Sequence, residues 1–184
     1  MTIAFERATE ADAAAIAAVR LAAARGLTAK FGRGTWSFAA DSEFGVQTEL
    51  RTSTLLVARD AASIIGALRL ALKNPYAIDT GFFTPVDRAA YLTAMAVAPK
   101  HQRQGVGRRL LGAARQEAVE LGAQAIRLDS YDAPAGAGEF YRRCGFTEVA
   151  RGDYRGTPLI WFEWLARPPA EPREPWIGKK GNSW

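Results

Sequence analysis

The sequence contains very few of the cysteine and histidine side chains that bind zinc or form disulfides. It has one cysteine, Cys144, and one histidine, His101, among its 184 residues. A single cysteine cannot form an internal disulfide, and no zinc-binding pattern of cysteine and histidine is present. No stretch approaches the roughly 20 consecutive apolar residues that a membrane-spanning helix requires. These absences predict a protein with no metal site and no membrane association.

The N-terminal segment also lacks a feature. Residues Met1 to Arg7 do not contain the long apolar core of a signal peptide. Together with the lone cysteine, this predicts a cytoplasmic protein in a reducing compartment. The length suits one domain, which we place at residues 1–166. The remaining segment, 167–184, is a proline-rich tail whose composition cannot build a core by itself.

The charge balance is basic, with a formal net charge of +5 and a sequence pI of about 9.7. Such a balance suits either nucleic acid or a small polyanionic ligand. A nucleic-acid-binding module would explain the pI, but no zinc-finger, RRM or helix-turn-helix pattern is present. The basic residues instead concentrate in one segment near Gly105. We therefore expect a small anionic ligand and no nucleic acid.

Apolar periodicity and turn residues divide the first half of the chain into two helices and a hairpin. Thr9 and Asp12 have the spacing of a capping box, and Gly26 is expected to end the helix that follows. The apolar, β-tolerant runs that come later predict two antiparallel strands. A long loop then carries several proline and glycine residues. The expected ranges are helices at 10–25 and 42–50, strands at 54–59 and 63–72, and the loop at 73–89.

The second half alternates strands and helices. An apolar strand ends at Pro99, and a polar glycine turn at 102–107 opens a helix that ends at Gly122. Strand, turn, helix and next strand form a crossover unit. The fold class is therefore α/β (α+β), with a mixed, partly antiparallel central sheet of about six to seven strands flanked by helices. The ranges expected here are strands at 91–98, 125–130, 146–151 and 159–165, and helices at 106–121 and 135–143.

The glycine turn before the second-half helix has the properties of an anion site. The start of a helix leaves four backbone N–H groups without partners, and glycine allows a ligand to approach them closely. Four basic residues crowd this positive end of the helix dipole, where cations are unfavourable without a bound anion. They are Lys100, Arg103, Arg108 and Arg109. The alternative is that these side chains extend into water and the glycines serve packing.

Two motifs resemble the signatures of one enzyme family. The pattern Gln102-x-x-Gly105-x-Gly107, after the strand and before Leu110, resembles the acyl-CoA-binding signature of the GNAT N-acetyltransferases. Ala137-x-x-Phe140-Tyr141-x-x-x-Gly145-Phe146 resembles the second signature of that family. The resemblance covers roughly residues 3–165, and in the first half it consists only of the order of elements.

The resemblance implies a cofactor, acetyl-CoA, and residues that hold it. In this family the sheet splays beside the strand before the glycine turn, so that backbone groups there pair with the pantetheine arm. At these positions the chain has Met95, Ala96 and Val97. Backbone N–H groups from Arg103 to Arg108 would hold the pyrophosphate. The cofactor-binding residues expected in the turn and at the helix start are Gln102, Arg103, Gln104, Gly105, Val106, Gly107 and Arg108.

Tyr141 falls where the family often places the tyrosine that protonates the departing thiolate. The alternative for Tyr141 is a packing residue with a solvated hydroxyl. One departure concerns Pro134, because family members often have asparagine seven residues before that tyrosine. A hydrogen bond that the asparagine gives to the cofactor is therefore absent or replaced.

The general base is left open by the sequence. An alkyl amine has a pKa of about 10.4, so a proton must be removed before the amine attacks. The strand at 91–98 carries no carboxylate for this task. Glu43 is our choice, since the segment before the hairpin often closes over the acceptor in this family. The other possibilities are a water chain, Asp41, Asp79, Asp87, Asp132 and Asp129, of which Asp129 is the most typical of a structural strand residue.

The function that these observations predict is N-acetylation, in which a primary amine attacks the thioester of acetyl-CoA directly. The acceptor is a small-molecule amine or a protein amine, and a homodimer is left open. The alternative is a noncatalytic acyl-CoA-binding regulatory module of the same fold. A dinucleotide-binding domain is excluded. Such a domain has three spaced glycines directly after an N-terminal strand, and this chain does not open in that way. The aromatic residues expected near the acceptor are Trp36, Phe38, Phe44, Tyr76, Phe82 and Phe83.

Overall fold

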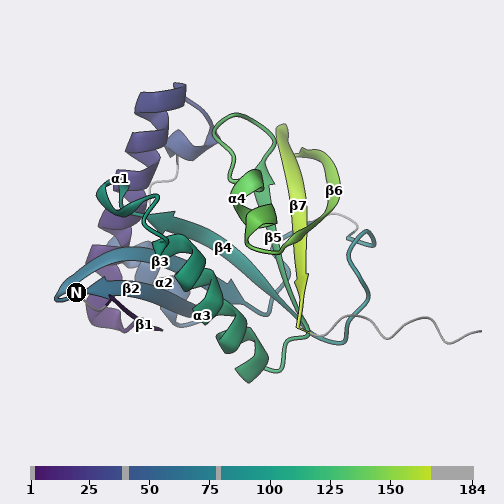
Figure 1. Ribbon diagram of the computed structural model, residues 1–184, viewed down its shortest axis with the longest axis horizontal. Coiled ribbons are helices and arrows are strands. Elements are labelled where there is room, and N and C mark those ends of the chain that lie inside the picture. The colour runs from purple at the N-terminus through teal and green to yellow at the C-terminus, as the bar shows by residue number, and fades with distance from the viewer. Residues whose placement is uncertain (1–2, 39–41, 78–79, 167–184) are drawn as a thin grey trace, which may run out of the picture.

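The computed structural model describes residues 3–38, 42–77 and 80–166. Within these residues one seven-stranded sheet runs through the molecule in the order β1-β2-β3-β4-β5-β7-β6, with helices on both faces (Figure 1). The strands are β1 Ile3–Arg7, β2 Thr54–Asp60, β3 Ser63–Ala71, β4 Ala89–Val97, β5 Ala125–Tyr131, β6 Thr147–Tyr154 and β7 Thr157–Leu165. The longer helices are α1 Ala13–Phe31, α2 Glu43–Leu50, α3 Val106–Glu120 and α4 Gly138–Arg143. The expected mixed sheet flanked by helices is confirmed.

The first four strands pair in an antiparallel manner, and alternation along β2 assigns its two faces to different helices. Leu55 and Val57 pack with α1 and α2, whereas Leu56 and Ala58 belong to the core that α3 covers. Successive side chains of a strand point to opposite faces, so a run of apolar residues supplies both cores at once. The predicted hairpin of β2 and β3 is confirmed.

The rest of the sheet consists of β5, β7 and β6. β5 is parallel to β4 and antiparallel to β7, and β6 and β7 form a hairpin. On one face of this half lies α4, whose Tyr141 packs in the main core with Phe162 of β7. On the other face lies the loop between β3 and β4, whose Phe83 packs against Leu159 and Trp161. The long loop therefore acts as a cover for the second half of the sheet.

Three expectations about the elements were wrong or incomplete. The first strand, β1, was missed, although Ile3 and Phe5 alternate with polar residues and pack against the core. α1 does not end at Gly26 but continues to Phe31 and ends before Gly32, which has a φ of 81°. A single glycine costs a helix only about 1 kcal/mol, and helix-forming residues follow Gly26. The helix expected at 135–143 begins only at Gly138.

The late start of α4 has a steric cause. The chain turns so tightly after β5 that a Cβ atom on Gly136 would lie 1.9 Å from the carbonyl oxygen of Tyr131. Only after this turn do the dihedral angles become helical. The predicted tail at 167–184 lies outside the described residues, as do Asp41 and Asp79. Among the described helices, none is long and apolar enough to cross a membrane.

Candidate active site

The sheet splits open between β4 and β5. The two strands pair only from Ala89 with Ala125 to Tyr91 with Arg127. β4 nevertheless continues to Val97, and β5 continues to Tyr131 with β7 as its only remaining partner. Figure 1 shows β4 running away from β5 above this point. The edge of β4 that faces β5 is therefore unpaired from Leu92 onwards, and a strand edge of this kind can pair with an extended ligand.

A bulge in β4 accompanies the split. Its register with β3 shifts between Thr93 and Ala96, so that two residues of β4, Ala94 and Met95, lie opposite the single residue Leu68 of β3. One of them, Ala94, has a φ of 51°, which is uncommon for a residue other than glycine. Bulges bend a strand and re-aim its side chains. The structure thus places the predicted Met95, Ala96 and Val97 on the part of β4 that departs from β5.

The start of α3 presents free backbone donors. The N–H of Arg109 makes the first hydrogen bond of the helix, to the carbonyl oxygen of Gly105 at 3.1 Å. The preceding N–H groups of Val106, Gly107 and Arg108 have no acceptor among the described residues. These donors and the positive end of the helix dipole together favour an anion.

Two arginines at this helix start are available for such an anion. Arg103 and Arg108 are exposed, and neither forms an ion pair with another described residue. Arg109, in contrast, lies over the ring of Phe5 at 4.6 Å and donates to the carbonyl oxygen of Ile3. Among the arginines of the basic cluster, Arg103 and Arg108 have no ion-pair partner in the described part of the chain, and Arg109 helps to hold β1 in place.

The amide side chains of the turn have a different role from the backbone. Gln102 donates to the carbonyl oxygen of Val97 at 3.0 Å, and Gln104 donates to that of Lys100 at 2.8 Å. Both bonds fix the path of the chain from β4 into α3. Gly105 adopts a left-handed conformation with a φ of 81°, which accounts for glycine at this position. The side chains of Gln102 and Gln104 therefore shape the turn.

Gly107 is surrounded closely enough to link the helix start to the rest of the site. A Cβ atom at Gly107 would lie 3.2 Å from the ring of Phe140 and 3.4 Å from the terminal methyl of Met95. Glycine is therefore required here for packing as well as for access to the backbone. The same Met95 extends to Tyr141, whose hydroxyl lies 3.8 Å from its sulfur.

Tyr141 is buried, with 7% of its surface exposed. Its ring packs against Phe140, Phe146 and Phe162, and its hydroxyl has no partner stronger than the Met95 thioether among the described residues. Burial raises the pKa of Tyr141 well above its ordinary value, and Asp129 acts in the same direction. The hydroxyl thus keeps its proton and is available as a donor. Tyr141 packs in the core and its hydroxyl also reaches the open edge, and its role as a general acid stays a prediction.

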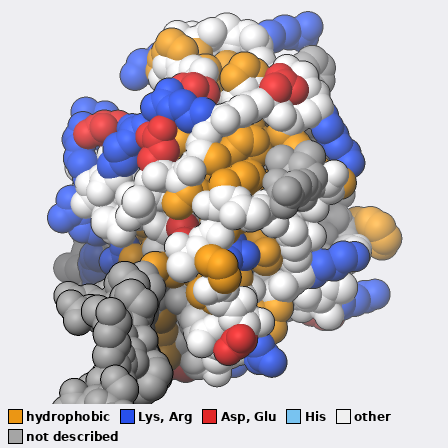
Figure 2. Space-filling view, turned by 90° about the vertical axis from the view of Figure 1, so that its right-hand side faces the viewer, with side chains coloured by type: hydrophobic (Ala, Val, Ile, Leu, Met, Phe, Trp, Pro, Cys, Tyr) orange, Lys and Arg blue, Asp and Glu red, His pale blue; other side chains and the backbone are white. Residues whose placement is uncertain are grey.

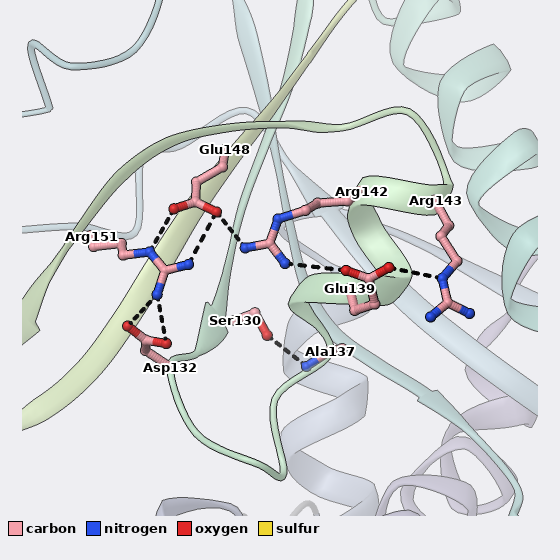
Figure 3. A network of polar contacts seen from close by, with 8 residues as sticks. All are labelled: Ser130, Asp132, Ala137, Glu139, Arg142, Arg143, Glu148 and Arg151. Carbon is pink, nitrogen blue, oxygen red and sulfur yellow. Dashed lines mark hydrogen bonds and ion pairs between the residues drawn. The ribbon is translucent and has the colours of Figure 1, made fainter.

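A network of charges and hydrogen bonds holds the short helix that carries Tyr141 (Figure 3). Glu148 of β6 binds Arg142 of α4 and Arg151 of β6, and the latter also binds Asp132 at 3.0 Å. Hydrogen bonds from Arg151 and Arg142 lower the pKa of Glu148 to about 2. At the start of α4, the N–H of Ala137 donates to the hydroxyl of Ser130 at 2.7 Å.

The network matters because α4 has only six residues. A helix this short is not stable by itself, so its position depends on its contacts. Ser130 lies near the end of β5, and its hydroxyl accepts the hydrogen bond from the N–H of Ala137, the residue that precedes α4. This bond fixes the segment around Pro134, the position at which relatives often have asparagine.

The carboxylates considered as bases lie in unlike environments. Glu43 is exposed in the first turn of α2, where it accepts a hydrogen bond of 3.4 Å from Gln47. Asp132 is exposed and paired with Arg151. The exposed backbone N–H of Asp87 donates to the side chain of Gln124. Asp41 and Asp79 fall outside the described residues, and the structure does not test the tentative role of Glu43.

Asp129 differs from these carboxylates. It lies on β5 two residues beyond the end of pairing with β4, and it accepts a hydrogen bond of 2.9 Å from the hydroxyl of Tyr76. Burial raises the pKa of the Asp129 carboxyl, and the bond from Tyr76 partly opposes this effect. The sequence favoured a structural role here because Asp129 alternates with Leu128. The resemblance implied that the sheet splays beside β4, but no local pattern places Asp129 next to that split.

The aromatic residues expected around the acceptor do not all come together. Tyr76, Phe82 and Phe83 form one layer over Trp161, and Phe83 is fully enclosed. Trp36 instead meets Tyr131 at the end of β5, with ring centroids 5.5 Å apart. Seen from the side of β6 and β7, apolar side chains gather near the centre of the surface, with basic side chains towards its edge (Figure 2).

One of the expected aromatic residues, Phe44, takes no part in these contacts. Phe44 is 77% exposed on α2. The side chain of Phe38 is not among those described.

A split mixed sheet with free helix amides beside the open strand has the geometry to accommodate an extended anionic ligand within the sheet. Comparison with known proteins identifies the family. The model of the acetyltransferase (GNAT) domain matches residues 51–148. The chain therefore belongs to the GNAT acetyltransferase family. A search of curated protein sequences found no match.

Several solved structures share the fold. PaiA N-acetyltransferase from Thermoplasma acidophilum, in complex with coenzyme A, has a TM-score of 0.70 at 18% identity, covering 90% of this chain and 99% of that one. The putative acetyltransferase YncA from Salmonella typhimurium, with its cofactor acetyl-CoA, gives 0.66 at 19%, covering 95% and 99%. Ribosomal-protein-alanine N-acetyltransferase from Brucella melitensis gives 0.67 at 20%, covering 88% and 99%. At these identities the similarity shows the fold.

Proposed function

We propose that this protein transfers an acetyl group from acetyl-CoA to a primary amine. The observation that supports the proposal best is the position of Met95. Its side chain lies against Gly107 at the free helix start and also against the hydroxyl of Tyr141. An anion-binding element, an unpaired strand edge and a proton donor are therefore joined through one residue at the split of the sheet.

The residues present fit the cofactor. The N–H groups of Val106, Gly107 and Arg108 have no protein acceptors and would bind the pyrophosphate, with Arg103 and Arg108 adding positive charge. The unpaired edge of β4 at Met95 to Val97 would bind the amide groups of the pantetheine arm as an added strand does. The Gln102 and Gln104 side chains would act by holding the turn in shape.

When bound, acetyl-CoA supplies a thioester whose carbonyl carbon accepts the amine and whose sulfur leaves. A backbone N–H of β4 next to the split would polarise the carbonyl oxygen, and the loss of one such donor costs other enzymes about 2.7 to 4 kcal/mol. Tyr141 would donate its proton to the sulfur. Its burial keeps that proton in place near neutral pH, and general acids of this kind contribute about 100-fold or more.

The acceptor is not selected by the fold. One structure of similar TM-score is an N-acetyltransferase of ribosomal-protein alanine, and another is an aminoglycoside 6'-acetyltransferase. A small amine and a protein amine both remain proposals for this chain. The cytoplasmic location and a homodimer also remain predictions, as does Glu43 as a base.

The experiment that tests the proposal measures thiol release from acetyl-CoA in the presence of a panel of alkyl amines. We expect release that depends on both the protein and the amine, with one thiol formed for each amide. Calorimetry with acetyl-CoA accompanies the assay. Binding without amine-dependent release by any amine would favour the noncatalytic acyl-CoA-binding module, and absence of binding would overturn both readings.

A further inference from the structure

Two polar side chains face the same side of the sheet where β4 and β5 separate. Tyr91 of β4 and Arg127 of β5 are the last paired residues, and the Arg127 guanidinium donates to the Tyr91 hydroxyl at 3.2 Å. Side chains two residues further along each strand share that face. These are Thr93 on β4 and Asp129 on β5. The split of the sheet therefore begins between a hydroxyl and a carboxylate.

Neither side chain is fully provided with partners. The Thr93 hydroxyl is buried and makes no hydrogen bond to a described residue. The Asp129 carboxylate accepts from the Tyr76 hydroxyl but forms no ion pair within the described part of the chain. Asp129 is only partly exposed, and a carboxylate withdrawn from water is costly unless a cation or several donors compensate its charge. The ionised Asp129 carboxylate thus lacks a positively charged partner among the described residues.

The neighbouring charges do not supply that counterpart. Arg127 is the nearest cation on the same strand face, but Glu163 binds it at 3.1 Å, and it also donates to the carbonyl oxygen of Thr84 at 2.7 Å. Arg69 of β3, which lies opposite Thr93, donates to the hydroxyl of Ser53 at 2.8 Å, and the other titratable neighbours are tyrosines, which are neutral near pH 7. The groups around Asp129 are Tyr76 from the β3–β4 loop, Tyr131 from β5, Tyr141 from α4, Tyr91 from β4, and the pair Arg127 and Glu163.

The surroundings suit an organic cation. Asp129 has Trp161 as its cross-strand neighbour, and Tyr76 also meets the Trp161 ring, with centroids 6.3 Å apart. Tyr131 follows on the same face and carries Trp36. Aromatic faces attract ammonium groups, most strongly where water is excluded. Moreover, this face of the second half is opposite the face covered by α4, so an acceptor and a cofactor held at α3 would approach from different sides.

From this juxtaposition we infer that Asp129 binds the acceptor as a primary alkylammonium ion and takes its proton before the acetyl transfer. Tyr76 is a positioning residue that holds the carboxylate, and Thr93 offers its hydroxyl to the same ammonium group. This inference rests on the proposed function and names the acceptor class for it. It also replaces Glu43 with Asp129 in the role of general base.

The proton balance of the step is complete. One N–H proton of the ammonium passes to a carboxylate oxygen of Asp129, which leaves a lone pair on nitrogen. That pair forms the new N–C bond while the C–S bond breaks. A second N–H proton is lost from nitrogen as Tyr141 gives its proton to the sulfur, and it restores the tyrosine. Ammonium and thioester thus give amide, thiol and one proton, which Asp129 returns to solvent.

One substitution distinguishes a purely structural role of Asp129 from a role in binding and deprotonating the amine. In Asp129→Asn the side chain keeps an oxygen that accepts the hydrogen bond from Tyr76, and its shape is unchanged. If Asp129 served only to satisfy Tyr76, this variant would behave like the parent. If it binds a cation and takes a proton, the variant loses both abilities. Asp153→Asn is the matched control, because Asp153 is an exposed carboxylate on β6 that accepts from the N–H of Gly156 at 2.7 Å.

The first experiment measures binding of benzylamine to the protein by calorimetry near neutral pH, with no acetyl-CoA present. We expect Asp129→Asn to bind benzylamine about ten-fold more weakly or worse, since a charge-assisted bond is lost. Asp153→Asn and the parent should agree, and neutral benzyl alcohol should not distinguish the variants. Parent-like binding by Asp129→Asn, loss of binding in Glu43→Gln instead, or no binding to the parent would overturn the inference.

The second experiment follows amine-dependent thiol release against pH. In the parent the rate should rise with pH as Asp129 loses its proton, with a midpoint above the ordinary aspartate range because burial raises its pKa. Tyr76→Phe removes a bond that lowers this pKa, so the midpoint should move to higher pH. In Asp129→Asn the rise in rate that depends on the Asp129 proton should be lost. The rate of this variant should instead keep rising with pH until the pH reaches the pKa of the free amine. An unchanged midpoint in Tyr76→Phe contradicts the inference.

The two readouts separate this inference from the proposed function. Thiol release that is the same in Asp129→Asn and in the parent would leave the acetyltransferase intact and remove Asp129 from its role. Benzylamine binding that depends on Asp129, without thiol release to any amine, would support the ammonium site and overturn the acetyl transfer.

Discussion

The hydroxyl of Tyr141 on α4 lies 3.8 Å from the sulfur of Met95 on β4. This contact spans the split of the sheet, because β4 has already left β5 at this level and α4 belongs to the other half. A thioether is a weak acceptor, so the hydroxyl loses little when a better partner replaces it. The relationship marks the place where a proton donor from the second half meets the open strand of the first.

Tyr141→Phe is expected to slow thiol release by about 100-fold or more while acetyl-CoA binding and the melting temperature change little. The ring packs against Phe140, Phe146 and Phe162, and phenylalanine preserves this packing. Steady-state kinetics and calorimetry on the same preparation check this prediction. The control is Tyr154→Phe, which removes a hydroxyl that accepts from the N–H of Ala77 at 3.3 Å. Equal rates for Tyr141→Phe and the parent would leave Tyr141 with packing alone.

Arg108→Glu is expected to affect stability and cofactor binding in opposite directions. A negative side chain in the first turn of α3 interacts favourably with the helix dipole, so the melting temperature should stay the same or rise. The same charge repels phosphate, and acetyl-CoA should bind about ten-fold more weakly. Thermal unfolding and calorimetry provide the two measurements. Arg51→Glu, with the same charge change at the end of α2, should leave affinity unchanged, and unaltered affinity in Arg108→Glu would place the phosphates elsewhere.

Asp129→Asn is expected to stabilise the protein near neutral pH. Burial raises the folded-state pKa of Asp129, so the ionised carboxylate is less stable in the folded protein than in the unfolded chain. Stability that Asp129 contributes when protonated is therefore lost as the pH rises through that pKa. The asparagine variant avoids this loss and should melt higher than the parent at neutral pH, with the difference vanishing below the ordinary aspartate range. Melting curves across pH would contradict this if the variant were less stable throughout.

Glu148→Gln is expected to weaken the attachment of α4. Arg151 and Arg142 hold the pKa of Glu148 at about 2, below its unfolded value, so the network stabilises the fold above about pH 4.3 and this contribution is lost as the pH falls toward 2. The side chains of Glu148, Arg142 and Arg151 all remain partly exposed to solvent, so the free energy of unfolding should fall by about 1 kcal/mol or less. The loss should also shrink with added salt. Denaturant unfolding at low and high salt tests this, and a salt-independent loss would point to packing instead.

Much of the fold was accessible from local patterns. The hairpin of β2 and β3, the helix α3 and the glycine turn before it each have their own signal in turn residues and apolar spacing. The same rules failed where distant contacts decide. Gly26 looks like a helix end, but α1 continues past it and packs there near Pro99, whose side chain is 3.5 Å from the position of an added Cβ atom. Likewise, α4 starts late because the chain at Gly136 passes so close to the carbonyl oxygen of Tyr131 that a tight turn precedes the helix.

The sequence by itself determined the helix start with its unpaired backbone N–H groups and the tyrosine of the second motif, because both depend on residues close together in the chain. Only the tertiary structure decided what Asp129 is near. Its partner Tyr76 is 53 residues away, and its place at the split depends on where β4 leaves β5. Strand separation and burial arise from the packing of whole elements, so the character of that carboxylate could not be read from its neighbours along the chain.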